Sequence, residues 1–385
     1  MPIRIHGFST EIQNSRIRYQ ALVDGVPLWI ELDESITPRS AGNFFVGAVL
    51  LHAMYEGQEI HLDESLPVST DYLSSIAALQ SIYCQWNGKL KQVSIIACEK
   101  EDIVLNNDSA SFFSGGIDGS YTLACKPEIN FVLCLNSFEG REQPDAWLNL
   151  IRRQRDFLAN QGKTLLHIAS NYRQLTEAWG VSHQFQHGIA LGSIATFLGF
   201  KNTYIPSSFT SDYLFPWGSH PLTDVLWSGN DFRIVHHGID VSRVDKTRKL
   251  ADNPELLNNI QVCWKYVDRN CGECHKCIRT MTALKFFSMH SVALPELKDI
   301  AHIADFKVTS VAAVPFVEEL AYLAEERGYE AVARKLRHRV RRFWIKHHAD
   351  ELLKLLVGDL LGPVVRRMRR NTWSTYKVHV TNQQK

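Results

Sequence analysis

The sequence predicts an α/β protein whose centre is a doubly wound parallel sheet. From residue 110 onward, short apolar runs alternate with helical patterns, and this alternation is typical of parallel sheets. The first of these runs leads directly into a pair of glycines. Apolar residues make up 45% of the chain and charged residues 22%, as in ordinary globular proteins. The length of 385 residues suggests two or three domains, which we place at residues 1–107, 108–290 and 291–385.

We expect residues 1–107 to form a separate α+β module. Apolar and polar residues alternate on both sides of Asp24-Gly25, which predicts a β-hairpin over Arg16–Asp33. Apolar helical patterns follow at Gly42–Tyr55 and Asp71–Trp86. A short strand is expected at Val93–Ala97.

The middle of the chain supplies the strands and helices of the predicted parallel sheet. Ligands in sheets of this kind bind beyond the carboxyl ends of the strands. Strands are expected at Ser111–Phe113, Phe131–Leu135, Thr164–Ile168, Thr203–Ile205 and Arg233–Val235, and helices at Asp145–Asn160 and His187–Phe200.

Residues 291–385 are predicted to be helical and basic, with the clearest helices at Phe316–Arg327 and Tyr329–His347. Between residues 334 and 370 the chain has twelve Lys or Arg and three Asp or Glu. A solvated helix face is the usual explanation of such a charge run, and RNA or an anionic membrane surface is the alternative. The apolar helix expected at Leu352–Leu361 would pack on the body of the protein or on a second copy in a homodimer.

Bulk properties point to no particular partner. The net charge is +1, and no apolar run reaches the ~18 residues of a membrane span. The first residues lack the apolar stretch of a secretory signal, so we expect a cytoplasmic protein.

A glycine-rich loop after the first strand of the middle segment is the strongest sign of nucleotide binding. It reads Ser114-Gly115-Gly116-Ile117-Asp118-Gly119-Ser120, with a helix expected to begin near the aspartate. Glycines let backbone N–H groups approach a ligand, and the amino end of a helix attracts phosphate. The carboxylate would repel bare phosphate, so its presence favours a bridging Mg²⁺. An ordinary turn followed by a helix cap is the alternative explanation.

Four of the eight cysteines lie within fifteen positions and form a predicted metal site. They are Cys263, Cys271, Cys274 and Cys277. Four thiolates suit tetrahedral Zn²⁺, and a site with all positions filled would be structural. An iron–sulfur cluster or redox-active thiols are the alternatives. The scattered Cys84, Cys98, Cys125 and Cys134 are expected to be free thiols.

The loop and the cysteines together resemble a known enzyme class. Residues 114–118 look like the SGGxD[ST] loop of PP-loop ATP pyrophosphatases, and the segment from Cys263 to Arg279 resembles the zinc segment of 7-cyano-7-deazaguanine synthase. The resemblance covers Ser111 to Leu284. It implies that the loop holds the pyrophosphate part of ATP, that Lys246 reaches the phosphates, and that the adenine lies near Asn136. Those enzymes adenylate a carboxylate, which ammonia then attacks.

The chain departs from that class in two places, of which the first bears on the rate and the second indicates a different substrate. The class usually has Ser or Thr after the aspartate, where this chain has Gly119, so Ser120 would have to supply the hydroxyl. The loop from residue 205 to 224 is long, aromatic and rich in hydroxyls. Simple packing would also explain its aromatic residues. As substrate contacts we name His187, Ser208, Asp212, His220 and Asp224.

The sequence therefore predicts an ATP-dependent ligase that forms AMP and pyrophosphate. Asp118 and Lys246 are the predicted catalytic residues, ATP, Mg²⁺ and Zn²⁺ the cofactors, and ammonia or another nitrogen nucleophile the second substrate. One alternative is sulfur transfer to a base or carrier, for which Cys125 and Cys134 are the candidate catalytic thiols. Another is a non-catalytic nucleotide-binding scaffold that contacts RNA or a protein.

Overall fold

The computed structural model describes residues 1–33, 35–100, 106–136, 143–297, 300, 303, 306 and 308–357. These residues form two compact units. The first contains Met1–Ser208 and Leu214–Ile239, and the second contains Phe209–Tyr213 and the described residues from Asp240 onward. No helix in the described part of the chain is long and apolar enough to cross a membrane.

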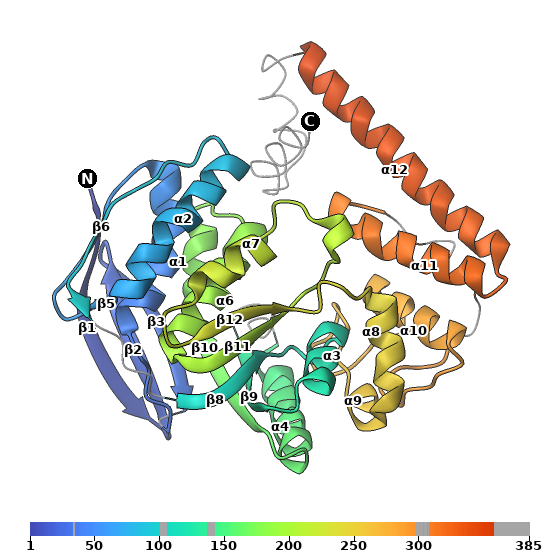
Figure 1. The fold of residues 1–385 in the computed structure, drawn as a ribbon, viewed down its shortest axis with the longest axis horizontal. Helices are drawn as coiled ribbons and strands as arrows, with labels where there is room; N and C mark the ends of the chain where they lie inside the picture. The colour runs from blue at the N-terminus through green and yellow to red at the C-terminus, as the bar shows by residue number, and fades with distance from the viewer. Residues whose placement is uncertain are drawn as a thin grey trace. The chain divides into compact units, whose positions relative to one another are not determined.

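The first unit is organised around a ten-stranded sheet, as counted over the described residues (Figure 1). Its order is β12-β11-β8-β9-β10-β3-β2-β1-β4-β6. A small second sheet pairs β5 (Val68–Ser69) with β7 (Glu99–Lys100). The strands of the large sheet are β1 (Ile3–Gln13), β2 (Arg16–Val23), β3 (Val26–Asp33), β4 (Ile60–Leu62), β6 (Ile95–Ile96), β8 (Asn106–Phe112), β9 (Ile129–Asn136), β10 (Thr164–Ser170), β11 (Phe200–Pro206) and β12 (Arg233–His237).

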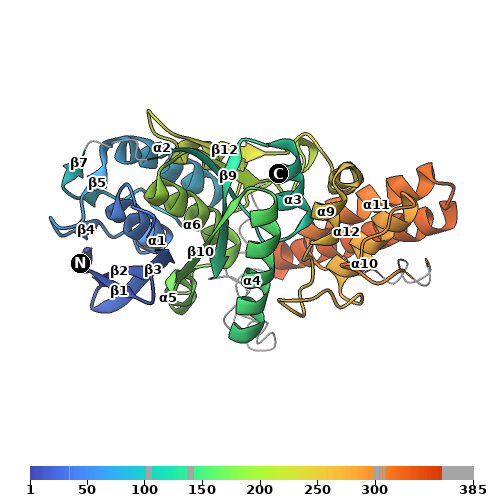
Figure 2. The same ribbon diagram turned by 90° about the horizontal axis from the view of Figure 1, so that it is seen from below.

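Strands β8 to β12 form the predicted parallel, doubly wound part. The chain runs from β8 outward to β9 and β10, then returns to β11 on the other side of β8. Because such crossovers are right-handed, the helices after β8 and β9 lie on one face and those leading into β11 on the other. The winding direction therefore reverses between β8 and β11. The helices are α3 (Ile117–Cys125), α4 (Pro144–Asn160, beside β10 in Figure 2), α5 (Tyr172–Ala178) and α6 (His183–Leu198).

Strands from the described residues between 1 and 100 extend this sheet, whereas the sequence predicted a separate module at residues 1–107. β3 pairs antiparallel with β10, and Ser170 Oγ donates a hydrogen bond of 2.6 Å to the carbonyl of Trp29. Helix α1 (Ala41–Glu56) packs on α6 so closely that a Cβ on Gly47 would lie 2.4 Å from the Cβ of Ser193. Residues 1–100 thus cover the β10 edge and one helix of the parallel part.

The predicted hairpin over Arg16–Asp33 is confirmed. β2 and β3 pair in register up to Val23 and Val26, and both turn residues have positive φ, 48° at Asp24 and 83° at Gly25. The expected helix at Asp71–Trp86 is α2 (Thr70–Trp86). The remaining helical turns of this unit are α7 (Pro221–Asp224) and η2 (Val225–Trp227).

The second unit is helical among its described residues. Helices α11 and α12 lie side by side, as Figure 1 shows, and confirm the two helices predicted for this part of the chain. The cysteine segment belongs to this unit, so the predicted boundary near residue 290 does not separate it from α11 and α12. The elements are η1 (Ser211–Tyr213), α8 (Arg243–Lys249), η3 (Leu250–Asp252), α9 (Pro254–Asn258), α10 (His275–Phe286), η5 (Val311–Ala313), α11 (Val314–Glu326) and α12 (Glu330–Val357). Residues 358–385, with the arginines at 366–370, lie outside the described residues.

Candidate functional site

The glycine loop lies where the winding direction of the sheet reverses. β8 ends at Phe112, and Gly115 has a φ of 79°, a conformation that favours glycine. Gly116 is extended and caps α3, with no side-chain hydrogen bond to the first turn. A glycine has no side chain with which to cap the helix, and the first N–H groups of a helix have no acceptor within the helix, so this end of α3 suits an anion. Ser114 beside them is exposed. Topological switch points of open α/β sheets are the usual place for ligands.

Asp118 and Ser208 approach each other at this point, each just after the end of one of two neighbouring strands, β8 and β11. Asp118 lies in the first turn of α3, and Ser208 follows the end of β11. Ser208 Oγ donates to Asp118 Oδ2 over 3.5 Å. The pair offers carboxylate and hydroxyl oxygens, the ligand type that Mg²⁺ prefers. The structure therefore brings together two predicted site residues that are ninety positions apart in the sequence.

His237 is a member of this cluster that the sequence analysis missed. It ends β12, and its Nδ1 lies 3.0 Å from Thr122 Oγ1, one turn along α3 from Asp118. Its ring stacks on Tyr121 with centroids 5.7 Å apart. The sequence feature that could have identified it is the pair His236-His237, directly after the predicted strand Arg233–Val235. His237 ties the end of β12 to the helix that follows the glycine loop.

The glycine at position 119 has a packing reason. A Cβ there would lie 2.9 Å from Cδ2 of Phe113, closer than real Cβ contacts come. A serine at this position would therefore displace Phe113, which is buried. Ser120 is 1% exposed, and its Oγ has no hydrogen-bond partner among the described residues. The Ser120 hydroxyl, which we expected to replace the Ser or Thr hydroxyl missing at position 119, thus lies in the interior of the protein.

Asn136, named for adenine binding, is the last residue of β9 and pairs with Ala169. Its Oδ1 is buried and finds no hydrogen-bond partner in the part of the chain that the structure describes. The adjoining Ser137 and Phe138 lie outside the described residues.

Three of the predicted substrate contacts instead form an internal network. Asp224 is completely buried and accepts hydrogen bonds from Ser219 Oγ at 2.7 Å, His220 N at 3.2 Å and His236 Nδ1 at 2.7 Å. The adjacent Ser219 N–H donates to His187 Nε2 over 3.3 Å. The network therefore fastens the loop after β11 to β12 and α6.

The charge state of this network follows from burial. Burial lowers the pKa of His220 to about 4, with nearby His236 adding to the effect and Asp224 opposing it. The pKa of His187 is lowered for the same reason. Both imidazoles are therefore neutral at pH 7. Asp212, the remaining predicted contact, is exposed on η1 in the second unit.

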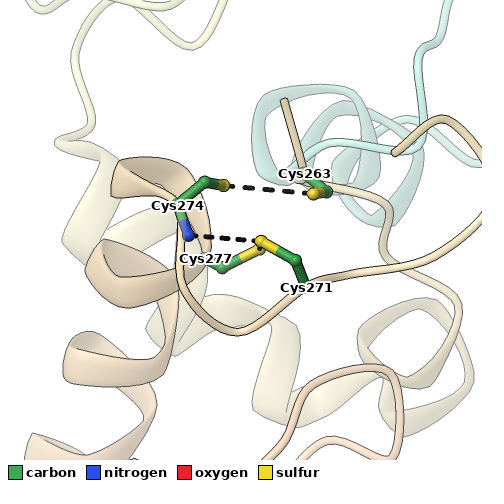
Figure 3. Close-up of side chains that lie close together, drawn as sticks. All are labelled: Cys263, Cys271, Cys274 and Cys277. Atoms are coloured by element: carbon green, nitrogen blue, oxygen red, sulfur yellow. Dashed lines mark hydrogen bonds between the residues drawn. The ribbon is translucent and has the colours of Figure 1, made fainter. Parts of the chain in front are cut away.

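The four clustered cysteines converge as a metal site would require (Figure 3). Their sulfurs all lie within 4.8 Å of one another, with Cys271 and Cys277 3.9 Å apart and Cys263 and Cys274 4.0 Å apart. Zn–S bonds of about 2.3 Å in a tetrahedron would place sulfurs about 3.8 Å apart. The cluster can therefore hold a zinc ion with little rearrangement.

Backbone N–H groups donate to two of these sulfurs, although burial raises the pKa of Cys271 and Cys277. Cys263 Sγ accepts from the N–H of Lys265 at 3.3 Å, and Cys271 Sγ accepts from the N–H of Cys274 at 3.2 Å. Burial alone would raise the pKa of Cys274, but hydrogen bonds from the backbone of Trp264 and Cys277 help lower it to about 7. Helix α10 begins directly after Cys274 and carries Cys277 in its first turn, so a metal bound by the cluster would hold the start of this helix.

Lys246, the predicted phosphate ligand, lies in α8 of the second unit. The helix begins after Ser242, whose Oγ accepts from the N–H of Asp245. Lys246 is only 1% exposed. A lysine this deeply enclosed is held in one place, whereas an ordinary surface lysine is solvated and mobile.

Comparison of the chain with models of protein families, with curated proteins and with solved structures found no match.

Proposed function

We propose that this protein is an ATP pyrophosphatase. It would activate a carboxylate by adenylation and transfer the resulting acyl group to ammonia or another nitrogen nucleophile. The observation that carries the proposal is the glycine loop at the switch point, where α3 begins after a glycine cap and Asp118 and Ser208 meet. The phosphate-loop chemistry and the cysteine segment support a PP-loop enzyme similar to 7-cyano-7-deazaguanine synthase. The acceptor would be a small or carrier-bound carboxylic acid.

The proposed reaction has two displacements. The substrate carboxylate forms a bond to the α-phosphorus while the bond to pyrophosphate breaks, with the loop N–H groups binding the phosphates. Nitrogen then bonds to the acyl carbon, AMP leaves, and the nitrogen loses a proton. Asp118 and Ser208 would hold Mg²⁺, which would offset the charge of the phosphates. Lys246 is proposed to stabilise the pyrophosphate.

The role of Asp118 can be tested through the sign of its effect on ATP binding. We expect Asp118→Asn to weaken binding of Mg²⁺·ATP at least tenfold, because a metal ligand is lost, and to leave unchanged or strengthen binding of ATP in EDTA, because a repelling charge is lost. Isothermal titration calorimetry measures both. Asp145→Asn, an exposed carboxylate in the first turn of α4, is the matched control. Weaker binding in EDTA as well would contradict the proposed role.

Sulfur transfer is the less supported alternative. Burial raises the pKa of the Cys134 thiol to about 12, and its Sγ donates to the carbonyl of Phe113. A thiol held in this way is a poor nucleophile. Cys125 is partly exposed and remains the candidate thiol of that mechanism. A Cys125→Ala/Cys134→Ala variant that keeps its ATP turnover would exclude it. In a non-catalytic scaffold, ATP would bind without conversion to AMP.

A further inference from the structure

Helix α12 presents a long cationic surface. From residue 331 to 349 it contains seven Lys or Arg, three His and no Asp or Glu. The buried side chains in this stretch are Ala333, Leu336 and Val340, on the side packed against α11. The exposed side includes Arg334, Lys335, Arg341, Arg342 and Lys346. These cations extend over about 18 Å of helix.

Flat rings are interleaved with these cations. The ring of Trp344 stacks on His348 with centroids 5.5 Å apart, and Phe343 stacks on His347 at 5.6 Å. A groove of about 400 Å³ opens on the same helix, lined by Arg337, Val340, Arg341, Trp344, Ile345 and His348 and by Glu318 of α11. Arg337 is paired with Glu325 of α11, so the cations left for a ligand are the other exposed ones. Ile345 is 62% exposed. The surface thus combines positive charge with apolar and aromatic contact area.

We propose that this face of α12 binds single-stranded nucleic acid. Cations along the helix suit the phosphates, and aromatic faces suit unpaired bases, which a duplex does not offer. Ala333, Leu336 and Val340 of α12 are buried beside α11, and the large aliphatic side chains left exposed on its described part are Ile345 and Leu352, whereas a helix that lies in a membrane needs a continuous apolar face. The proposal stands independently of ATP chemistry in the first unit.

Binding can be measured by fluorescence anisotropy with a labelled 20-nucleotide oligouridylate and the full chain. We expect Arg341→Gln/Arg342→Gln/Lys346→Gln to weaken binding about tenfold or more at 100 mM salt. The slope of log affinity against log salt should fall in magnitude by about 2, because three phosphate contacts are lost. The matched control, Lys89→Gln/Arg152→Gln/Lys201→Gln, removes three exposed cations from the first unit and should change affinity less than twofold.

Trp344 tests the stacking part of the proposal. Trp344→Ala should weaken binding about fivefold or more, and Trp344→Phe should restore most of it, because phenylalanine keeps an aromatic face. Both variants keep the cations, and circular dichroism checks that the helix is retained. The arginines at 366–370 are intact in every variant.

Several results would overturn the proposal. Equal losses in the two triple variants would indicate unspecific electrostatic attraction. Unchanged affinity in the α12 variant would place binding elsewhere, the basic tail included. Tighter binding to duplex RNA of the same length, or to phosphatidylserine vesicles than to oligouridylate, would assign the surface to another partner.

Discussion

At the residue scale, the contact between Gly119 and Phe113 makes the departure from the usual phosphate loop testable. We expect Gly119→Ala to lower the free energy of unfolding, because the overlap of the new Cβ with the Phe113 ring should cost about 1–3 kcal/mol. This cost should exceed the gain of about 1 kcal/mol that alanine brings to a helix. Urea denaturation measures the difference. Gly88→Ala, with no atom within 4 Å of its added Cβ, is the control and should change stability little. A more stable Gly119→Ala protein would contradict the packing explanation.

The buried network gives a pH prediction at the same scale. The pKa of His220 is lowered from 6.5 to about 4, so the unfolded chain takes up the proton first as the pH falls. The contribution of this residue is therefore complete above pH 6.5 and is lost between pH 6.5 and 4, by up to about 3 kcal/mol.

His220→Asn isolates this effect. An asparagine can still accept the hydrogen bond that Leu222 N donates to His220 Nδ1, and it does not titrate. Urea denaturation between pH 7 and 4 should therefore show a smaller loss of stability in the variant than in the wild type. Parallel curves for the two proteins would show that His220 does not carry the pH dependence.

At the element scale, the start of α10 should depend on the cysteine cluster. We expect about one zinc per chain in the purified protein and in Cys98→Ser, an exposed thiol of the first unit, but far less in Cys274→Ser. Metal analysis measures the stoichiometry. Chelation should make the segment around residues 263–277 more sensitive to protease. An iron–sulfur absorbance band, or full zinc content in Cys274→Ser, would contradict the assignment.

Local patterns predicted most elements well. The hairpin could be predicted from Asp24-Gly25 because a two-residue turn with positive φ at both positions favours these residue types. Helix periodicity placed α11 within two residues of both ends and the start of α12 within one. The predicted end of α12 at His347 is ten residues short, because the helix continues to Val357 through the start of the segment predicted as a separate helix at Leu352–Leu361. The expected helix over His187–Phe200 begins four residues earlier, at His183, because Ser182 caps it by accepting from Gln184 N. The two-residue strands β5 and β7 carry too little pattern to be found from sequence.

At the scale of the whole molecule, the pairing of distant segments was the limit of prediction. Nothing near β3 indicates that β10, more than a hundred residues away, pairs with it. The same limit applies to the candidate site. The loop at residues 114–118 could be found because its chemistry is local, whereas His237 and the His236–Asp224 pair depend on contacts between strands and loops. We predicted that Asp224 contacts a substrate, whereas in the structure it is buried and accepts hydrogen bonds from other residues of the protein.

Phosphorus NMR of the products of ATP tests most directly whether this protein cleaves the bond between the α- and β-phosphates. The protein would be incubated with ATP, Mg²⁺, ammonium and a panel of carboxylic acids, beside Asp118→Asn. We predict AMP and pyrophosphate in equal amounts, dependent on one class of acid, with turnover lost in the variant. ADP and orthophosphate as products, or unchanged ATP across a broad panel, would contradict the proposed function.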